Sequence, residues 1–270
     1  MSQPDTTYTP SQPDVEEGIE YWSTQPASYD GVLGGFGSGL MPELSTVPSA
    51  IRPLKTPPAH TRRTRALDVG AGVGRVTSDV LLHLVSDVVL VEPVEGFVNE
   101  AWKRGASSAE GILVEDSSHA RWKGIQDKTK SVTVLQGTLQ ALDPLHPLAD
   151  PTTKLLGRLG YEPAEEDLES GFDVIWCQWC LGHLSNVDLV AFFKRCRQGL
   201  RDPDNSIIVV KENLCHNAAD GGPETVFDPS DSSLTRSDLA WKKAFTRAGL
   251  TLVHEQVQRG FPVGLYEVRM

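Results

Sequence analysis

The fold of this chain is most tightly limited by a glycine-rich turn that follows a short buried segment. Residues 66–69 read Ala-Leu-Asp-Val and predict a strand, and three glycines then stand at alternate positions, Gly70, Gly72 and Gly74. Glycine permits a sharp turn with positive φ, and it lets a ligand approach the backbone without meeting a Cβ. A helical pattern begins directly afterwards, at Arg75. This strand–turn–helix order predicts a nucleotide-binding α/β unit.

A second strand is predicted over residues 87–91, and it ends at Glu92. A carboxylate about 20 residues past a glycine loop can accept hydrogen bonds from ribose hydroxyls. Dinucleotide-binding proteins use Gly-x-Gly-x-x-Gly, whereas here Asp68 precedes a Gly-x-Gly-x-Gly run and Arg75 follows it. The pattern resembles motif I of the class I S-adenosylmethionine-dependent methyltransferases. That resemblance implies that Arg75 pairs with the cofactor carboxylate and that Asp68 lies near the cofactor's amino acid end. Because the glycine spacing differs from that of dinucleotide-binding proteins, a nicotinamide oxidoreductase is the least favoured of the functions considered.

The rest of the chain alternates strands with helices. Strands are predicted over residues 66–69, 87–91, 131–135, 172–177, 206–210, 251–257 and 265–270, and helices over 75–85, 96–104, 187–200 and 237–248. Repeated βα units imply a mostly parallel sheet with right-handed crossovers, and the last two strands are expected to pair antiparallel. These units and the resemblance to motif I together imply an α/β, Rossmann-like class I methyltransferase fold with a mostly parallel seven-stranded sheet and an antiparallel C-terminal strand.

Three regions are expected along the chain: a disordered tail over residues 1–14, an N-terminal helical extension with a lid over 15–64, and the cofactor-binding methyltransferase domain over 65–270. Polar segments predict insertions in this domain near 105–129 and 143–170. Trp22 and Phe36 belong to a stretch of the extension that is rich in glycine and aromatic residues. This stretch is either a lid over a cationic cofactor or a loop packed by its own side chains.

Charge and cysteine content narrow the range of partners. The chain has 25 basic and 36 acidic residues, a net charge of −11, which argues against nucleic acid because phosphates need a basic surface. No apolar run approaches the roughly 20 residues of a transmembrane helix, so no membrane partner is expected.

Cys177 and Cys180 have zinc-like spacing but no second pair, so we expect buried free thiols and no metal. A reducing, soluble compartment follows, and we expect the cytoplasm, with the nucleus as a second location.

Several chemistry-bearing side chains follow the predicted strands, where ligands bind in open α/β sheets. Gln178, Trp179 and His183 follow the fourth strand. Gln178 can donate to a cofactor, and Trp179 offers a flat apolar wall. His183 can accept a proton, because its ordinary pKa lies near neutrality. A helix-capping or core histidine is the alternative at that position.

Four further polar residues each admit two interpretations. Asn213 either holds a peptide backbone through its amide or forms a turn after the fifth strand. Asp228 and Asp231 either form a small anionic pocket for a cation or cap a loop. Tyr266 either binds a ligand or, more commonly for such a residue, lies half-buried in a strand.

Several motifs together resemble the protein α-N-terminal methyltransferases, over about residues 17–266. They are Tyr21-Trp22, Asp30-Gly31-Val32-Leu33-Gly34-Gly35-Phe36-Gly37, Leu67–Arg75, Val174–Trp179, Gly182-His183-Leu184, Lys211-Glu212-Asn213 and Asp231-Ser232-Ser233. Enzymes of this family methylate the exposed α-amine of proteins that begin Xaa-Pro-Lys or Xaa-Pro-Arg after loss of the initiator Met. The resemblance implies S-adenosyl-L-methionine as cofactor, S-adenosyl-L-homocysteine as product, and substrates such as ribosomal proteins.

The resemblance also assigns roles by position. It assigns to the cofactor Trp22, Gly70, Gly72, Arg75, Glu92, Leu139, Gln140 and Gln178. It assigns proton removal from the amine to His183 and Asp231. It assigns to the substrate Phe36, Trp179, Asn213, Asp228, Ser233 and Tyr266, with Trp179 stacking on the proline and Asp228 meeting the third-residue Lys or Arg. The chain departs from the family pattern at three positions, since Glu92 and Glu212 stand where Asp is common and Phe36 stands where Tyr is common.

Acid–base chemistry supports an α-amine as the acceptor. An α-amine has a pKa of about 8 and a lysine ε-amine one of about 10, so a single general base suffices for the former at neutral pH. Two alternatives stay open. One is a methyltransferase for a lysine side chain or a small molecule, and the other is a non-catalytic module that binds S-adenosylmethionine or peptide. The sequence leaves the number of transferred methyl groups open.

Overall fold

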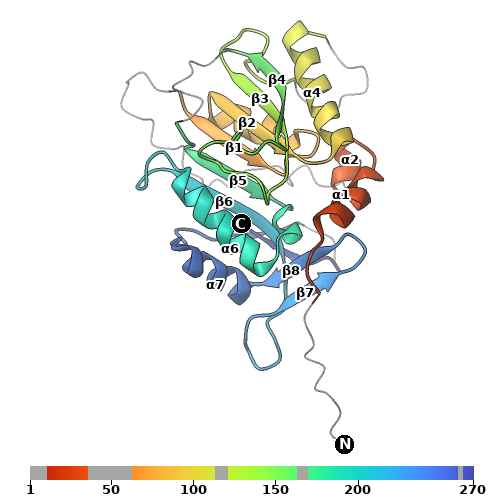
Figure 1. Cartoon of the computed structure of the whole chain (residues 1–270), viewed down its shortest axis with the longest axis vertical. Helices are drawn as coiled ribbons and strands as arrows, with labels where there is room; N and C mark the ends of the chain where they lie inside the picture. Colours follow the sequence, from red (N-terminus) through yellow and green to blue (C-terminus); the bar gives the residue numbers. More distant parts are fainter. Residues whose placement is uncertain (1–10, 36–62, 113–120, 163–169, 261–263) are drawn as a thin grey trace, which may run out of the picture.

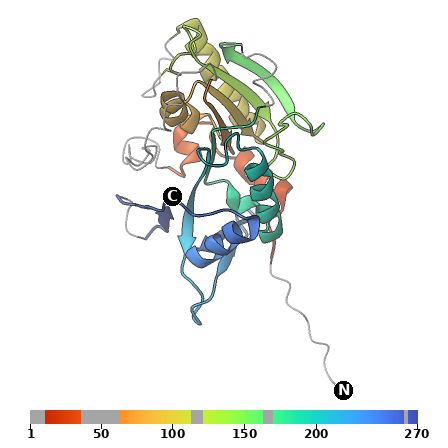
Figure 2. The ribbon, with the colours of Figure 1, turned by 90° about the vertical axis from the view of Figure 1, so that its left-hand side faces the viewer.

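The computed structural model describes residues 11–35, 63–112, 121–162, 170–260 and 264–270. The strands of these residues are β1 Arg65–Val69, β2 Asp87–Glu92, β3 Ser131–Gln136, β4 Lys154–Gly160, β5 Val174–Gln178, β6 Ile207–Cys215, β7 Thr225–Asp228, β8 Ser233–Ser237, β9 Val257–Gln258 and β10 Glu267–Arg269. They form one sheet in the order β4-β3-β2-β1-β5-β6-β10-β9, and β8 pairs with β6 and β7 (Figures 1 and 2).

Helices cover both faces of this sheet. The helical segments are α1 Val15–Ser23, α2 Tyr29–Val32, the π-helical η2 Thr77–Leu81, α3 Leu82–Leu84, α4 Glu95–Glu110, the 3₁₀ turn η3 Leu181–His183, α6 Asn186–Gln198 and α7 Asp238–Ala248. Side chains of α6 and α7 pack in the core on one face, and those of η2, α3 and α4 pack on the other. Within the described ranges, no helix has both the length and the apolar character needed to cross a bilayer.

The central strands form because their side chains are covered on both faces. Every residue of β1 and β2 is buried, as expected for parallel strands enclosed by helices. Successive side chains point to opposite faces, so Leu67 packs with α6 and α7 whereas Ala66 packs with η2, α3 and α4. Leu67 is in register with Val89 on β2 and Ile175 on β5. These observations confirm the predicted Rossmann-like α/β fold.

The described residues form ten strands, whereas the sequence predicted seven. The strands that were not predicted are β4, β7 and β8. β4 lies inside the segment 143–170 that was expected to be an insertion, and it pairs antiparallel with β3. The register shifts between Val134 and Leu135, so β4 does not keep the simple two-residue alternation by which strands are recognised.

Helix α4 is longer than predicted. Its predicted end is residue 104, and it continues to Glu110. The first part of the segment 105–129 is therefore helix and not insertion. The helical pattern is not recognisable from the sequence here because small residues, Gly105 and Ser108, face the core. A Cβ on Gly105 would lie 2.8 Å from the ring of Trp122, and Ser108 Oγ accepts a hydrogen bond from Trp122 N at 3.1 Å. Trp122, in the middle of the same segment, is only 3% exposed and belongs to the core.

Strand β6 also extends past its predicted end at residue 210. It continues to Cys215, so Asn213 lies within the strand, opposite Val268 of β10, and does not form a turn. β9 and β10 confirm the predicted antiparallel C-terminal pair. Both are shorter than the predicted 251–257 and 265–270.

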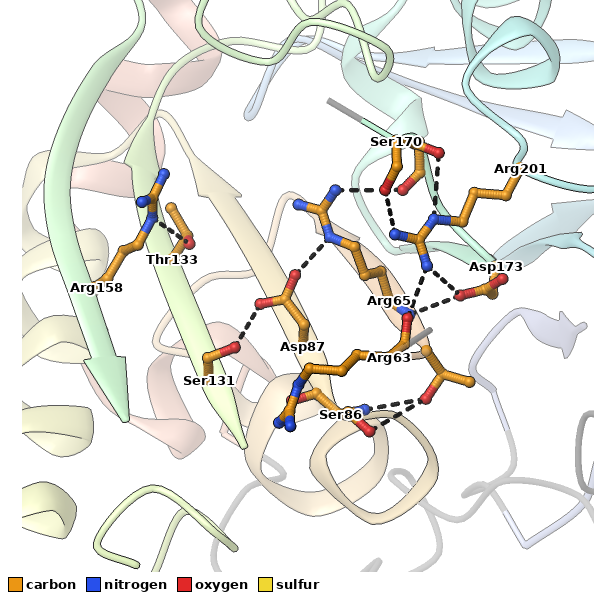
Figure 3. A network of polar contacts seen from close by, with 12 residues as sticks. Arg63, Arg65, Ser86, Asp87, Ser131, Thr133, Arg158, Ser170, Asp173 and Arg201 are labelled. Carbon is orange, nitrogen blue, oxygen red and sulfur yellow. Dashed lines mark hydrogen bonds and ion pairs between the residues drawn. The ribbon is translucent and has the colours of Figure 1, made fainter. Parts of the chain in front are cut away.

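A network of polar contacts closes the amino ends of the central strands (Figure 3). The Arg65 guanidinium lies 2.5 Å from the Asp87 carboxylate, and both side chains are 2% exposed. Ser131 Oγ donates to Asp87 at 2.7 Å. Asp173 accepts from Arg65 N at 2.7 Å and from Arg201 at 3.0 Å. Strands β1, β2, β3 and β5 are thus joined by side chains as well as by backbone pairing.

The N-terminal extension begins with α1. Asp14 caps this helix by accepting from the amides of Glu16 and Glu17 at 2.8 and 3.1 Å, so the last residue of the predicted tail 1–14 has a structural role. Asp14 N donates to Ser232 Oγ at 2.9 Å. α1 is therefore attached to the turn between β7 and β8. Phe36, near the end of the predicted lid, lies outside the described residues.

Candidate active site

A cavity lies at the carboxyl ends of the parallel strands, beneath α1. Ten of the predicted site residues line it: Trp22, Gly70, Gly72, Arg75, Glu92, Leu139, Gln140, Gln178, Trp179 and His183. They come from α1, from the ends of β2 and β5, and from the segments that follow β1, β3 and β5. The structure thus brings together all eight residues predicted for the cofactor, with Trp179 and His183.

The glycine loop has the geometry that its sequence predicts. Gly70, Gly72 and Gly74 have φ values of +61°, +57° and +78°, in the left-handed region that favours glycine. A Cβ on Gly70 would lie 2.4 Å from Cys180 Cβ. The loop after β1 can therefore pack against the loop after β5, which places both at the floor of the cavity.

Glu92 is held at the end of β2 with both carboxylate oxygens in use. Gly72 N donates to Oε2 and Val94 N donates to Oε1, each at 2.8 Å. Burial raises the pKa of Glu92 from 4.5 to about 7, although the two amides act in the opposite direction. A carboxylate oxygen can accept more than one hydrogen bond, so Glu92 can still receive two hydroxyl donors from the cavity.

Asp68 and Arg75 lie on the same side of the glycine loop. Thr77 Oγ1 donates to Asp68 Oδ2 at 2.6 Å, and burial raises the pKa of Asp68 to about 6. Burial lowers the pKa of Arg75, while Tyr29, Asp79 and Asp68 favour its charged form. A buried guanidinium at the cavity wall suits a carboxylate ligand.

The end of β5 presents polar atoms that lack protein partners. Gln178 Oε1 accepts from Trp176 Nε1 at 3.2 Å, whereas its buried Nε2 has no hydrogen-bond partner among the described residues. Because a buried donor without a partner is costly, Nε2 is a donor that a ligand in the cavity can satisfy.

Trp179 has a backbone conformation that is uncommon for an aromatic residue. Its φ is +55°, and its amide donates to Lys211 O at 3.0 Å, which holds the residue against β6. Arg75 and Lys211 lie 5.8 and 5.2 Å from its ring centroid. Burial, with a smaller effect from Arg75, lowers the pKa of Lys211 to about 7. Local strain of this kind is commonly kept where a side chain must point into a binding site.

His183 is held from two sides. Gln140 Nε2 donates to His183 O at 3.0 Å, and Trp22 Nε1 donates to His183 Nε2, also at 3.0 Å. Burial lowers the pKa of His183, while the Asp231 carboxylate and a backbone group of Ser232 raise it. Asp231, half-buried in the β7–β8 turn, therefore acts on His183 electrostatically. Ser185, and not His183, is the N-cap of the following helix α6, and His183 lines the cavity.

Apart from Trp179, the described residues predicted for the substrate are not among the residues that line the cavity, and neither is Asp231. Asp228 is exposed and caps its own turn, accepting from Ser230 N and Oγ at 2.8 and 2.6 Å. Ser233 lies beside Gly182, where an added Cβ would be 3.3 Å from its own. Tyr266 is 48% exposed, and Asn213 is in β6. Phe36 lies outside the described residues.

Some residues of the site were not predicted from the sequence. On α1, Val15, Gly18 and Ile19 line the cavity together with Trp22, and their helical spacing is a signal that could have identified them. Glu212 accepts from the amides of Cys180 and Leu181, both at 3.0 Å. Burial raises its pKa to about 7.

The cysteines add no cluster to this site. Cys177, Cys180, Cys196 and Cys215 are free, and the first three are buried as predicted, whereas Cys215 is partly exposed. Only Cys180 is among the cavity-lining residues.

Comparison with known proteins decides the family. The family described as AdoMet-dependent proline di-methyltransferase matches residues 11–129 and 156–270. The chain belongs to this family. It is 32% identical to "Alpha N-terminal protein methyltransferase 1" of Schizosaccharomyces pombe, over 94% of this chain and 93% of that protein. It is 31% identical to "N-terminal Xaa-Pro-Lys N-methyltransferase 1-B" of Xenopus laevis, over 92% and 89%.

A solved structure agrees with the fold of this AdoMet-dependent family. The protein from Leishmania major described as a SAM-dependent methyltransferase is 28% identical, with a TM-score of 0.62, over 94% of this chain and 80% of that chain. The predicted resemblance and the predicted AdoMet dependence are thus confirmed. The cavity fits such a cofactor, because it offers an unpartnered amide donor at Gln178, a buried carboxylate at Glu92 and a backbone free of Cβ atoms at Gly72.

Proposed function

We propose that this protein transfers a methyl group from S-adenosylmethionine to the α-amine of proteins that begin Xaa-Pro-Lys or Xaa-Pro-Arg. The observation that carries the proposal is the position of His183, which lines the cofactor cavity and has the Asp231 carboxylate beside it. The names of the relatives in Schizosaccharomyces pombe and Xenopus laevis support an α-amine as the acceptor. Ribosomal proteins are the substrates that we propose, with the cytoplasm and the nucleus as locations.

The cofactor roles follow from the cavity's donors and acceptors. Glu92 would accept from the ribose hydroxyls, Arg75 would pair with the amino acid carboxylate, and Gln178 would donate through Nε2. Gly70 and Gly72 would let the cofactor approach the backbone, and Leu139, Gln140 and Trp22 would complete the walls. When bound, the cofactor supplies an electrophilic methyl group on a sulfonium.

The acceptor amine must lose a proton before it can react, because a protein α-amine with a pKa of about 8 is mostly protonated at neutral pH. We assign that proton to the pair formed by His183 and Asp231. The Asp231 carboxylate would also attract the incoming ammonium. A positioned general base contributes about 10²–10⁴-fold to such a step, and holding the amine in line contributes further by removing translational freedom.

The remaining residues would select the peptide. Trp179 would stack on the second-residue proline, and Asp228 would meet the third-residue Lys or Arg with an exposed carboxylate. Asn213, Ser233, Tyr266 and Phe36 would line the path of the chain beyond the cavity. Because Asp228 and Tyr266 lie outside the cavity, this selection would act on the peptide surface and not on the reacting nitrogen.

The test is a mass-spectrometric methylation assay with purified protein, S-adenosylmethionine and Xaa-Pro-Lys peptides. We expect added methyl units on the α-amine, and none on the same peptides with a blocked α-amine. Label on blocked peptides would favour the lysine alternative. Asp231→Asn and His183→Ala should each lose at least 10²-fold in kcat, with cofactor binding kept in calorimetry. A double variant with normal activity would remove both residues from the reaction.

A further inference from the structure

A direct hydrogen bond joins α1 to the candidate base. Trp22 Nε1 lies 3.0 Å from His183 Nε2, and the two rings meet edge to face, with centroids 6.4 Å apart and planes at 85°. Trp22 is packed in turn against Phe97 of α4, with ring centroids 6.3 Å apart. The indole is thus held between α4 and His183, on the inner face of α1.

The chemistry of the indole determines what this bond means for the imidazole. An indole N–H can donate but cannot accept. Nε2 of His183 must therefore present its lone pair to Trp22, and the proton of the neutral ring must be on Nδ1. An imidazole with its proton on Nε2 would place two N–H groups against each other.

The other side of the ring is enclosed by the protein. Nδ1 is buried and has no hydrogen-bond partner among the described residues, while a backbone group of Ser232 favours the protonated ring. Nδ1 faces α1 at Gly18 and the backbone of the β7–β8 turn, since a Cβ on Gly18 would lie 3.0 Å from Nδ1 and 3.5 Å from Asp231 O. A glycine inside a helix costs about 1 kcal/mol relative to alanine, and here it leaves the space that Nδ1 occupies. Gly18 and Trp22 are four residues apart, so they contact His183 from one face of α1.

We propose that Trp22 is a positioning residue, which holds His183 in the tautomer with the proton on Nδ1 and covers the lone pair of Nε2. While the indole is in place, Nε2 cannot accept a proton from a bound amine. The buried Asp231 Oδ1, which has no hydrogen-bond partner among the described residues, is the acceptor that stays open. His183 can accept at Nε2 only after the indole has turned away, so α1 controls which member of the pair acts.

Asp231 is the ionisable side chain that acts on His183. It favours the protonated ring, as does a backbone group of Ser232, so both oppose the indole, which stabilises the neutral ring. The acids of α1, Glu16, Glu17 and Glu20, are exposed. Arg236 of β8 donates to the carbonyls of Leu181 and Leu184, and Gln140 is neutral.

Removing the indole N–H should therefore raise the pKa of His183, because the bond stabilises only the neutral ring. A net hydrogen bond of the usual strength corresponds to a rise of about 0.4–1 pH unit. This part of the inference needs no substrate. Its catalytic meaning rests on the proposed function, in which the lower limb of the pH profile of kcat/KM would move upward by the same amount.

The experiment is NMR of the free, full-length protein labelled with ¹⁵N at histidine. His183 is assigned by the signal that disappears in His183→Gln. We expect its Nδ1 to carry the proton and its Nε2 to be unprotonated at a pH above its pKa. In Trp22→Phe the ring is kept and the donor is lost, so the His183 pKa should rise, whereas Trp102→Phe on α4 should leave it unchanged.

A proton on Nε2 in the unmodified protein would overturn the proposal, as would an unchanged His183 pKa in a folded Trp22→Phe protein. If that variant does not fold, the tautomer of the unmodified protein still decides. Failure of the proposed function is a separate result, because absent methylation of Xaa-Pro-Lys peptides would leave the NMR measurement intact.

Discussion

The two ends of the parallel strands bury ionisable groups in opposite ways. At the amino ends, Arg65 and Asp87 pair with each other, and Ser131 donates to the same carboxylate. At the carboxyl ends, Glu92 accepts two backbone amides but no side-chain donor among the described residues, and burial raises its pKa to about 7. The protein therefore supplies the partners of its buried ionisable groups at the amino ends of the strands, and it leaves that role to a ligand at the carboxyl ends.

This contrast has an energetic basis. A buried charge costs several kcal/mol unless it is paired. The amino-end network meets that cost within the protein and can contribute to stability. In the cavity, the cost of burying Glu92 and the unpartnered Nε2 of Gln178 is not fully offset by the protein. Hydrogen bonds from a bound ligand can offset it and so increase the affinity for that ligand.

The largest effect is expected at Arg65, in the network at the amino ends of the strands. Arg65→Met leaves the Asp87 carboxylate buried without its positive partner, so we expect the free energy of unfolding to fall by about 3–5 kcal/mol. Urea denaturation measures this change. The double variant Arg65→Met/Asp87→Leu removes both charges and should recover much of the loss. If the double variant is as unstable as the single one, the uncompensated charge is not the cause.

The second test concerns the pH dependence at Glu92. Its folded-state pKa of about 7 lies above the ordinary 4.5, so the folded state binds more protons than the unfolded state between these values, and stability falls as pH rises through this window. In Glu92→Gln this fall should be smaller by about 1–3 kcal/mol between pH 4.5 and pH 8. Urea titrations at several pH values measure it.

Glu95→Gln, at the exposed start of α4, is the matched control and should keep the fall of the unmodified protein. Calorimetry should show weaker S-adenosylmethionine binding for Glu92→Gln only. An unchanged pH slope in Glu92→Gln would contradict the interpretation of Glu92 as a buried acid that lacks a charge partner.

The third test separates backbone strain from ligand space. Gly72 and Gly249 have φ values of +57° and +73°, and a Cβ at either position would lie 3.3 or 3.2 Å from a neighbouring side chain. Gly72→Ala and Gly249→Ala should each cost about 1–2 kcal/mol in stability. Only Gly72→Ala should also weaken S-adenosylmethionine binding in calorimetry. Equal loss of binding in both variants would mean that strain alone accounts for the effect.

The smallest effect is expected at Asp228, which belongs to neither end of the sheet. Asp228→Asn should leave the free energy of unfolding within about 0.5 kcal/mol, because the residue is exposed. It should raise KM several-fold for Xaa-Pro-Lys peptides and leave it unchanged for Xaa-Pro-Gln peptides, since a surface ion pair is worth up to about 1 kcal/mol. Equal changes for both peptides would remove Asp228 from charge selection.

The cavity was largely predictable because its residues stand at strand ends. Gly70, Glu92 and Gln178 directly follow or end apolar runs that are easy to recognise, and parallel strands bring such positions to one edge. By contrast, the approach of Gly18 to His183 depends on a helix that is distant in sequence. The length of β6 also escaped prediction, because Lys211-Glu212-Asn213 looks like a polar loop until its pairing with β10 is known.

The same reasoning explains the missed strand β4 and the missed end of α4. Leu159 of β4 fits beside Gly105 of α4, where an added Cβ would lie 2.4 Å from it. Neither segment has a strong hydrophobic pattern of its own. Strand β4 and the end of α4 pack against each other, and this contact between distant segments is not visible in the local periodicity of either one.

The attachment of α1 has a consequence for biosynthesis. Asp14 and Trp22 contact Ser232 and His183, which are 218 and 161 residues later in the chain. At about 5–20 residues per second, the ribosome makes the helix roughly 10–40 s before it makes the segment that anchors it. A nascent chain therefore carries α1 without its partners, and α1 can cover the cavity only after His183 and Ser232 have been made.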